Sequence, residues 1–188
     1  MANVDAPNGL RPVKHLDGSP YNGAFNRYYV PASDSTAIFL GDAVVSAGSA
    51  DADGIPSVAQ AAAGDADIIG VVVGIEPRTD EDLNFRAAST ERYLYVADAP
   101  DLVFEIQEDS VGGALAAANV GQNADLVVGT GDSTVGRSAM ELDSSSATAS
   151  TAQMRILSLA QRPDNEIGTN AKWLVMINEH AYKITAGT

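Results

Sequence analysis

The apolar positions of this chain fall into many short runs rather than into helical repeats. The clearest run, Ile68–Ile75, is almost entirely β-branched and is interrupted only by Gly70 and Gly74. β-Branched side chains pack well on a pleated surface, so the run predicts a strand that is buried on both faces. The two glycines indicate bulges or sharp bends, as at the corners of a small barrel.

Further apolar and aromatic runs lie on both sides of this strand, at 43–45, 93–96, 102–106, 126–128, 153–161 and 173–177. The runs 93–96 and 102–106 are separated by an Asp/Pro turn, a spacing that predicts a β-hairpin. A second hairpin is expected from 173–177 and 182–184. Many short strands with Gly-rich corners predict an all-β fold, an antiparallel β-barrel or sandwich.

One short helix is predicted near residues 113–120. Asp109 or Ser110 can cap its N-terminus, and Gly121 follows at the position where helices commonly end. About two turns of alanine-rich sequence are marginally stable alone, so this helix must be held by packing.

The second half of the chain resembles the first in its order of runs and loops. The spacing is about eighty residues, counted from Tyr93 to Trp173. This pattern predicts two similar β sub-units, 34–108 and 122–188, joined by the short helix. The alternative is that two unrelated all-β stretches look alike at this level of detail.

Residues 1–33 have a different composition from the β-rich body, 34–188. Their prolines and glycines disfavour a helix or a central strand, so we expect an extended N-terminal arm. Tyrosine and arginine are enriched in the hot spots of interfaces. The candidate partner-binding residues of the arm are Arg11, Tyr21, Phe25, Arg27, Tyr28 and Tyr29. We expect the arm to attach the chain to a partner and residues 1–20 to be dispensable for folding, with packing on its own body as the alternative.

The formal net charge of −14 bears on the choice of partner. Nucleic acids and anionic membrane surfaces both attract basic faces, and eleven Lys and Arg against 25 Asp and Glu do not favour either partner. No apolar run is long enough for a transmembrane helix, and the first residues lack the apolar segment of a signal peptide. We therefore expect synthesis in the cytoplasm. The chain has no cysteine, which excludes disulfides and thiolate metal sites.

The residue types needed for catalysis are sparse. His15 and His180 are the only histidines, they have no partner at metal-ligand spacing, and no serine lies in a G-x-S-x-G motif. The pairs Asp51/Asp53 and Asp65/Asp67 have too few further ligands for calcium and are more typical of Asx-turns. We therefore predict no enzyme activity, no cofactor and no metal. The alternatives are a calcium- or carbohydrate-binding β-module on a virion or cell surface, and an enzyme whose site is assembled from scattered polar residues.

Several phrases of the sequence, taken in order, carry a resemblance over nearly the whole chain. They are ANVDAPNGLRPVKHLDGSPYNG, RYYVPASDSTAIFLGDAVV, IIGVVVGIEP, RYLYVADAPDLVFEIQED and AKWLVMINEHAYK. Together they resemble the head-decoration, or cement, proteins of tailed bacteriophages. The resemblance implies a virion structural protein made in the host cytoplasm that binds the major capsid protein on the outer capsid surface. It also implies a homo-oligomer, with a trimer favoured over a dimer. It assigns no role to individual residues.

Overall fold

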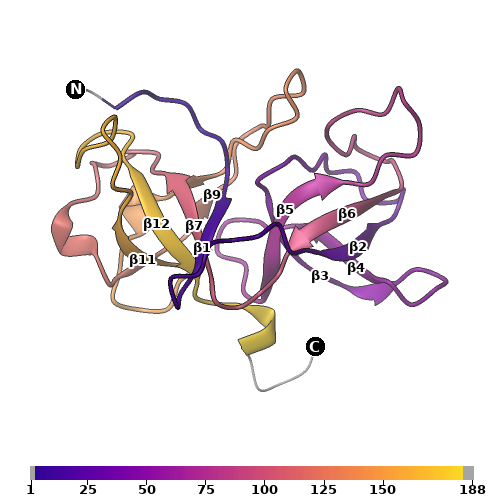
Figure 1. The fold of residues 1–188 in the computed structure, drawn as a ribbon, viewed down its shortest axis with the longest axis horizontal. Coiled ribbons are helices and arrows are strands. Elements are labelled where there is room, and N and C mark those ends of the chain that lie inside the picture. Colours follow the sequence, from indigo (N-terminus) through magenta and orange to yellow (C-terminus); the bar gives the residue numbers. More distant parts are fainter. Residues whose placement is uncertain (1–2, 184–188) are drawn as a thin grey trace.

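The computed structural model describes residues 3–183 and shows an all-β chain with two lobes (Figure 1). One lobe is a closed five-stranded barrel, in which all neighbouring strands are antiparallel except β2 and β4. The order around the barrel is β2 (Asn26–Val30), β4 (Pro56–Gln60), β3 (Ala43–Ala50), β5 (Ile68–Ile75) and β6 (Arg92–Ala97). The predicted all-β class is therefore confirmed.

The other lobe is built on an open antiparallel sheet. Its order is β1 (Arg11–His15), β7 (Leu102–Gln107), β12 (Lys172–Ile177), β11 (Met154–Leu159) and β8 (Asn123–Ala124). A two-stranded ribbon of β9 (Leu126–Val127) and β10 (Glu141–Leu142) packs beside it. Helical structure in the described chain is limited to the single 3₁₀ turns η1 (Ala117–Asn119), η2 (Ser144–Ser146) and η3 (Ala181–Lys183). No helix within residues 3–183 has the length and apolar character that a membrane span requires.

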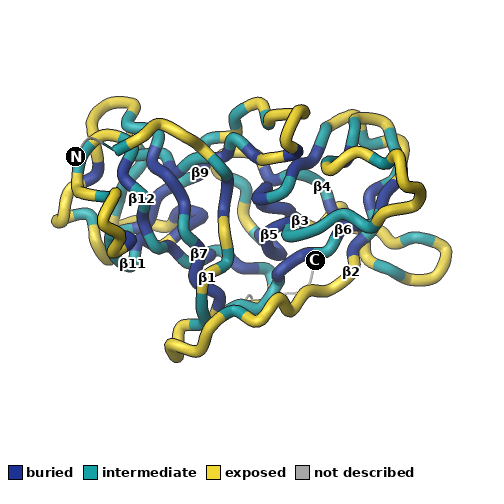
Figure 2. The backbone as a smooth tube through the Cα atoms, turned by 45° about the horizontal axis from the view of Figure 1, so that its top comes forward, coloured by how far each residue is buried: buried dark blue, intermediate teal, exposed yellow. Residues whose placement is uncertain are grey.

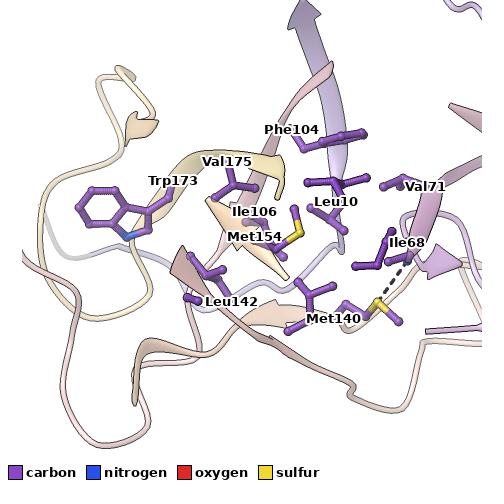
Figure 3. Packing of buried hydrophobic residues seen from close by; sticks show 14 of the residues in the cluster. Leu10, Ile68, Val71, Phe104, Ile106, Met140, Leu142, Met154, Trp173 and Val175 are labelled. Atoms are coloured by element: carbon purple, nitrogen blue, oxygen red, sulfur yellow. Dashed lines mark hydrogen bonds between the residues drawn. The ribbon is translucent and has the colours of Figure 1, made fainter. Parts of the chain in front are cut away.

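Strand β5 is the wall that the two lobes share. Ile69 and Val72 lie in the barrel core, whereas Ile68 and Val71 belong to the core of the sheet lobe. Figure 3 shows Ile68 and Val71 beside Leu10, among residues of the sheet lobe. The prediction of a strand buried on both faces is confirmed, since every residue from Ile68 to Val72 is buried.

The glycines of β5 adjoin irregularities of the ladder, as the sequence predicted. Pairing with β3 shifts register beside Gly70, and pairing with β6 shifts just before Gly74. A Cβ atom on Gly70 would lie 2.3 Å from the carbonyl oxygen of Ala97, so the backbone of β6 approaches too closely for any side chain here. A bulge at this point adds one residue to the alternation, so Ile68 and Val71, three positions apart, face the same core.

The two cores differ in composition. The barrel core is aliphatic with one aromatic ring: Tyr28, Val30, Ile38, Val44, Val58, Ile69, Val72, Leu94 and Val96. The sheet core is larger and includes Trp173, Phe104, Met140 and Met154 (Figure 3). Exposed residues concentrate in the connecting loops (Figure 2).

The predicted hairpin over 93–106 is wrong. Strand β6 pairs with β2 and β5 in the barrel, whereas β7 pairs with β1 and β12 in the sheet. The turn between them carries the chain from one lobe to the other. A turn signal fixes a change of direction but not the partner of the strand that follows it. The expected second hairpin also does not form where the chain is described, because η3 follows β12, and Ile184 lies outside the described residues.

The predicted helix over 113–120 is reduced to the one 3₁₀ turn η1. Gly112 and Gly113 take φ values of 86° and 125°, which lie outside the right-handed helical region and delay the helix start. The lobes also do not repeat one arrangement, because β7 of the first predicted sub-unit joins the sheet of the second. The predicted boundaries 34–108 and 122–188 thus do not coincide with the lobes, and the duplication itself stays a prediction.

Residues 3–33, the described part of the predicted arm, are part of both lobes rather than a separate arm. Strand β1 forms an edge of the sheet, and β2 is a full member of the barrel. Leu10 is 1% exposed in the sheet core, and its N–H donates to the carbonyl of Gly41 at 2.9 Å. A deletion of residues 1–20 would remove strand β1 and the core residue Leu10, so the structure argues against the expectation that this segment is dispensable for folding. Within residues 3–33, irregular chain precedes β1, and a turn closed by a hydrogen bond from Gly18 N–H to the carbonyl of His15 follows it before β2.

Candidate functional site

The outer surface of the barrel along β2 and β6 carries a continuous group of aromatic side chains. Successive strand residues point to opposite faces, so Tyr28 and Val30 face the core while their neighbours face outward. Antiparallel pairing then places Arg27 opposite Tyr95 and Tyr29 opposite Tyr93. We define the aromatic face by its five members: Phe25, Arg27, Tyr29, Tyr93 and Tyr95.

Ring contacts connect the members of the aromatic face. Phe25 stacks on Tyr95 with ring centroids 4.4 Å apart and an interplanar angle of 27°. Tyr29 and Tyr93 meet at 5.4 Å with a tilt of 48°. Both distances are in the favourable range for aromatic pairs. Phe25 is 50% exposed, so much of its surface remains available to a partner.

Arg27 is fixed in the middle of the aromatic face. Its Cζ lies 3.6 Å from the centroid of the Tyr93 ring, a cation–π arrangement. Its Nε and Nη2 donate to the two carboxylate oxygens of Glu76 at 2.5 and 2.8 Å. This bidentate hydrogen bond raises the pKa of Arg27 further above its ordinary value. The guanidinium plane is thus held in one orientation before any partner arrives.

The two tyrosine hydroxyls at the centre of the face donate to carboxylates. The Tyr93 hydroxyl donates to Oδ2 of Asp51 at 2.7 Å, a hydrogen bond that raises the pKa of Tyr93 to about 12. The Tyr29 hydroxyl donates to Oε2 of Glu91 at 3.2 Å. With Glu76, these groups give the aromatic face an acidic rim.

Gly74 of β5 leaves room for the ring of Tyr95. The two residues are paired across the strands, and a Cβ atom on Gly74 would lie 2.9 Å from Cδ2 of Tyr95. An aromatic ring that covers a glycine on the neighbouring strand is a known device for stabilising a sheet. Gly74 therefore positions the stacked pair of Tyr95 and Phe25.

The structure brings three of the six predicted partner-binding residues, Phe25, Arg27 and Tyr29, onto this one face. Sequence reasoning missed Tyr93 and Tyr95. The alternation in RYLYV indicated a strand with outward-facing tyrosines, but the pairing of that strand with β2 has no local signal. Non-local pairing thus completes a surface whose first half was visible in the sequence.

Tyr28 must be removed from the predicted partner-binding residues. It is 2% exposed and packs in the barrel core, where its hydroxyl donates to Oδ2 of Asp98 at 2.7 Å. The same hydroxyl shares a 2.5 Å hydrogen bond with that of Tyr182, and burial raises the pKa of Tyr28. The side chain stabilises this chain's own barrel and is not accessible to a partner.

Tyr21 and Arg11 lie away from the aromatic face. Tyr21 is half-buried against the sheet core, and its hydroxyl donates to the carbonyl of Ala24 at 2.8 Å. Arg11 lies on β1, in the sheet lobe, and is exposed. The six predicted residues therefore do not form one site.

The first aspartate of each loop pair, Asp51 and Asp65, binds backbone N–H groups of its own turn. Oδ1 of Asp51 accepts from the backbone N–H groups of Asp53 and Ile55 at 2.9 and 2.8 Å, and Oδ2 of Asp65 accepts from that of Ala62 at 2.7 Å. Within the described residues, no three His, Asp or Glu side chains are grouped as metal ligands. Burial lowers the pKa of His180 to about 4 and holds its ring neutral near pH 7.

Comparison of the chain with protein families, with curated proteins and with solved structures finds no match.

Proposed function

We propose that this chain is a virion structural protein, a decoration or cement protein that binds the outer surface of a phage capsid. Two things support the proposal: the resemblance of the sequence phrases, and the aromatic face on the barrel. The face is the observation that carries the argument, because it combines the exposed ring of Phe25 and partly exposed tyrosine rings with an arginine that is already oriented.

The aromatic face has the chemistry of an interface hot spot. Tyrosine and arginine are over-represented among the residues that dominate binding energy, and rigid side chains lose little entropy when they bind. Arg27 is held by Glu76, and Tyr93 by Asp51, so little ordering remains to be done on binding. The acidic rim suits a partner surface that carries lysine or arginine around an apolar centre, and the proposed partner is the major capsid protein.

We also propose that the chain acts as a homo-oligomer on the capsid lattice, with a trimer favoured over a dimer. Several copies joined together engage several equivalent sites, which raises the apparent affinity without new contacts. A protein that binds only the mature lattice stabilises it by mass action.

A co-sedimentation assay with expanded capsids tests the proposal. We expect Phe25→Ala to weaken binding by about 30-fold, since truncation of a hot-spot aromatic costs about 2 kcal/mol. Leu16→Ala is a matched control, because Leu16 is also a large exposed apolar residue, at 56%, and lies outside the aromatic face. The control is expected to bind within about twofold of the wild type.

Equal binding by Phe25→Ala and the wild type would contradict the assignment of the aromatic face, and no binding of the wild type would contradict the capsid proposal. The stacked rings beside carboxylates also fit the alternative of a carbohydrate-binding module. Binding to a glycan array, lost in Phe25→Ala, together with no capsid binding, would favour that alternative.

A further inference from the structure

A second surface, in the sheet lobe, gathers positive charge in this strongly acidic chain. A cavity of about 520 Å³ lies between the N-terminal residues 6–9, the strands β1, β7 and β12, and the segment 130–139. Four of the eleven Lys and Arg of the chain line it: Arg11, Arg137, Arg162 and Lys172. Among residues 3–183, the carboxylates that line it are those of Glu105 and Asp132 alone. We call this cavity the basic groove.

Three of the four cations in the basic groove form no ion pair with a carboxylate of residues 3–183. Arg162 is paired, with Glu105 at 2.9 Å and Asp164 at 3.1 Å. The remaining three, Arg11, Arg137 and Lys172, lie beyond ion-pair distance of any described carboxylate. In a chain with 25 Asp and Glu, cations that stay unpaired beside one another are available for carboxylates supplied from outside.

The second acid of the basic groove is already engaged. The backbone N–H of Thr134 donates to Oδ1 of Asp132 at 2.7 Å, and this hydrogen bond lowers the pKa of Asp132. Its carboxylate therefore serves its own turn. Glu105 is likewise engaged with Arg162.

Close backbone packing fixes the wall of the basic groove that holds Arg11 and Arg137. Gly9 has a φ of 62°, and a Cβ atom on it would lie 2.5 Å from both the carbonyl oxygen of Gly41 and Cβ of Ser138. The N–H of Ser138 in turn donates to the carbonyl of Leu40 at 2.9 Å. Three segments distant in sequence are thus locked together, which preorganises the neighbouring cations.

We propose that the basic groove binds an extended acidic segment of a partner protein, with side-chain carboxylates paired to Arg11, Arg137 and Lys172. Exposed Val135 and the ring of Pro7 also line the groove and suit the apolar side chains of a polypeptide. The net charge of −14 opposes any polyanion, but a nucleic acid carries a phosphate at every nucleotide and is repelled more strongly than a segment with a few carboxylates. This proposal stands independently of the aromatic face and of capsid binding.

Fluorescence anisotropy of the full chain with a labelled hexapeptide of four glutamates and two valines tests the proposal. We expect binding at about 0.15 M salt, where the Debye length of about 8 Å screens the more distant acidic residues. Arg11→Gln combined with Lys172→Gln should weaken this binding about tenfold, since it removes two ion pairs. Neither side chain makes an ion pair within the described chain, so the fold is expected to be retained, as a thermal melt would check.

The matched control combines Lys14→Gln with Arg155→Gln, which removes the same charge outside the groove. This control should bind the peptide within about twofold of the wild type, because only distant charge is altered. Equal weakening by both double variants would overturn the proposal, as would the absence of wild-type binding or a preference for a labelled oligonucleotide. Self-association of the wild type that the groove variant abolishes would assign the groove to a second copy and overturn it too.

Discussion

The barrel and the sheet lobe solve the problem of free strand edges in different ways. The barrel closes on itself, so backbone pairing satisfies its strands around a largely aliphatic core. The sheet is open, and buried polar side chains hydrogen-bond to backbone groups of the segments that pack around it. Gln153, which is fully buried, accepts from the N–H of Leu126 and donates to the carbonyls of Ala62 and Asp65.

Glu108 has a similar role in the sheet lobe. Its Oε2 accepts from the N–H of Leu115 at 2.8 Å and from Nε1 of Trp173 at 3.2 Å, although the residue is fully buried. A buried polar group costs free energy when its partner is lost. The comparison teaches that the barrel closes its strands by backbone pairing and uses buried polar side chains such as Arg86 in the loops at its end, whereas in the sheet lobe such side chains also bond to the strands, as Glu108 does to Trp173.

The largest effect on stability is expected at Trp173, because this residue both fills the sheet core and donates a hydrogen bond to buried Glu108. Trp173→Ala should lower the free energy of unfolding by about 3–5 kcal/mol, because it opens a cavity in the sheet core. Trp173→Phe keeps much of the ring volume but removes the indole donor to Glu108, so a loss of about 1–3 kcal/mol is expected. Urea denaturation measures both values. A Phe variant as stable as the wild type would mean that the polar partner contributes nothing.

The two glycines of β5 sharpen the comparison within the barrel. Gly70→Ala should cost about 1–3 kcal/mol or more, because its Cβ would meet the rigid backbone of Ala97. Gly74→Ala should cost less than about 1 kcal/mol, since the Tyr95 ring can shift by rotation. Paired thermal melts give the difference, and the reverse order would contradict the described contacts.

The contribution to the pH dependence of stability should have opposite signs at Glu108 of the sheet lobe and at Asp82 of the barrel. Burial raises the pKa of Glu108, so between its unfolded value of 4.5 and the higher folded value the folded state holds more protons. Stability therefore falls as pH rises through this window, with a limiting slope of about 1.4 kcal/mol per pH unit for one proton. Glu108→Gln should remove this slope in denaturation series from pH 4 to pH 8.

Asp82, in the loop between β5 and β6 of the barrel, should behave in the opposite way. Hydrogen bonds from the N–H of Arg78 and from buried Arg92 lower its pKa from 3.8 to about 2. Its contribution is present above pH 3.8 and is lost as pH falls through about 2. Asp82→Asn should reduce the fall in the free energy of unfolding as pH is lowered toward 2. An unchanged fall in a denaturation series at low pH would show that other carboxylates cause it.

The smallest effect on stability is expected on the aromatic face. Arg27→Gln removes an exposed ion pair and a cation–π contact, which together should change the free energy of unfolding by about 1 kcal/mol or less. A much larger loss in a urea melt would mean that Arg27 holds the barrel together rather than presenting a surface.

Features with a local cause could be predicted from the sequence. The double burial of β5 and the irregularities beside Gly70 and Gly74 follow from a β-branched run broken by glycine. Phe25 and Arg27 could be named as candidate partner-binding residues because residues 1–33 are rich in aromatic and basic side chains. What remained open was their setting, because strand alternation shows which residues share a face but not which strand lies alongside.

Features that depend on distant segments were beyond the sequence. Arg86 is fully buried and donates to the carbonyls of Thr90, Pro31 and Asp34, which joins loops at one end of the barrel. Nothing in its local sequence distinguishes it from the exposed Arg78. The same reason explains the failure of the hairpin prediction, since a strand's partner is set by the whole core.

The shared strand β5 has a mechanical consequence. Because Ile69 and Val72 belong to one core while Ile68 and Val71 belong to the other, neither lobe can swing without exposing apolar surface of both. The two lobes should therefore move as one rigid body, with the aromatic face and the basic groove at a constant separation. A partner that contacts both surfaces would have to match the fixed distance between them as well as their chemistry.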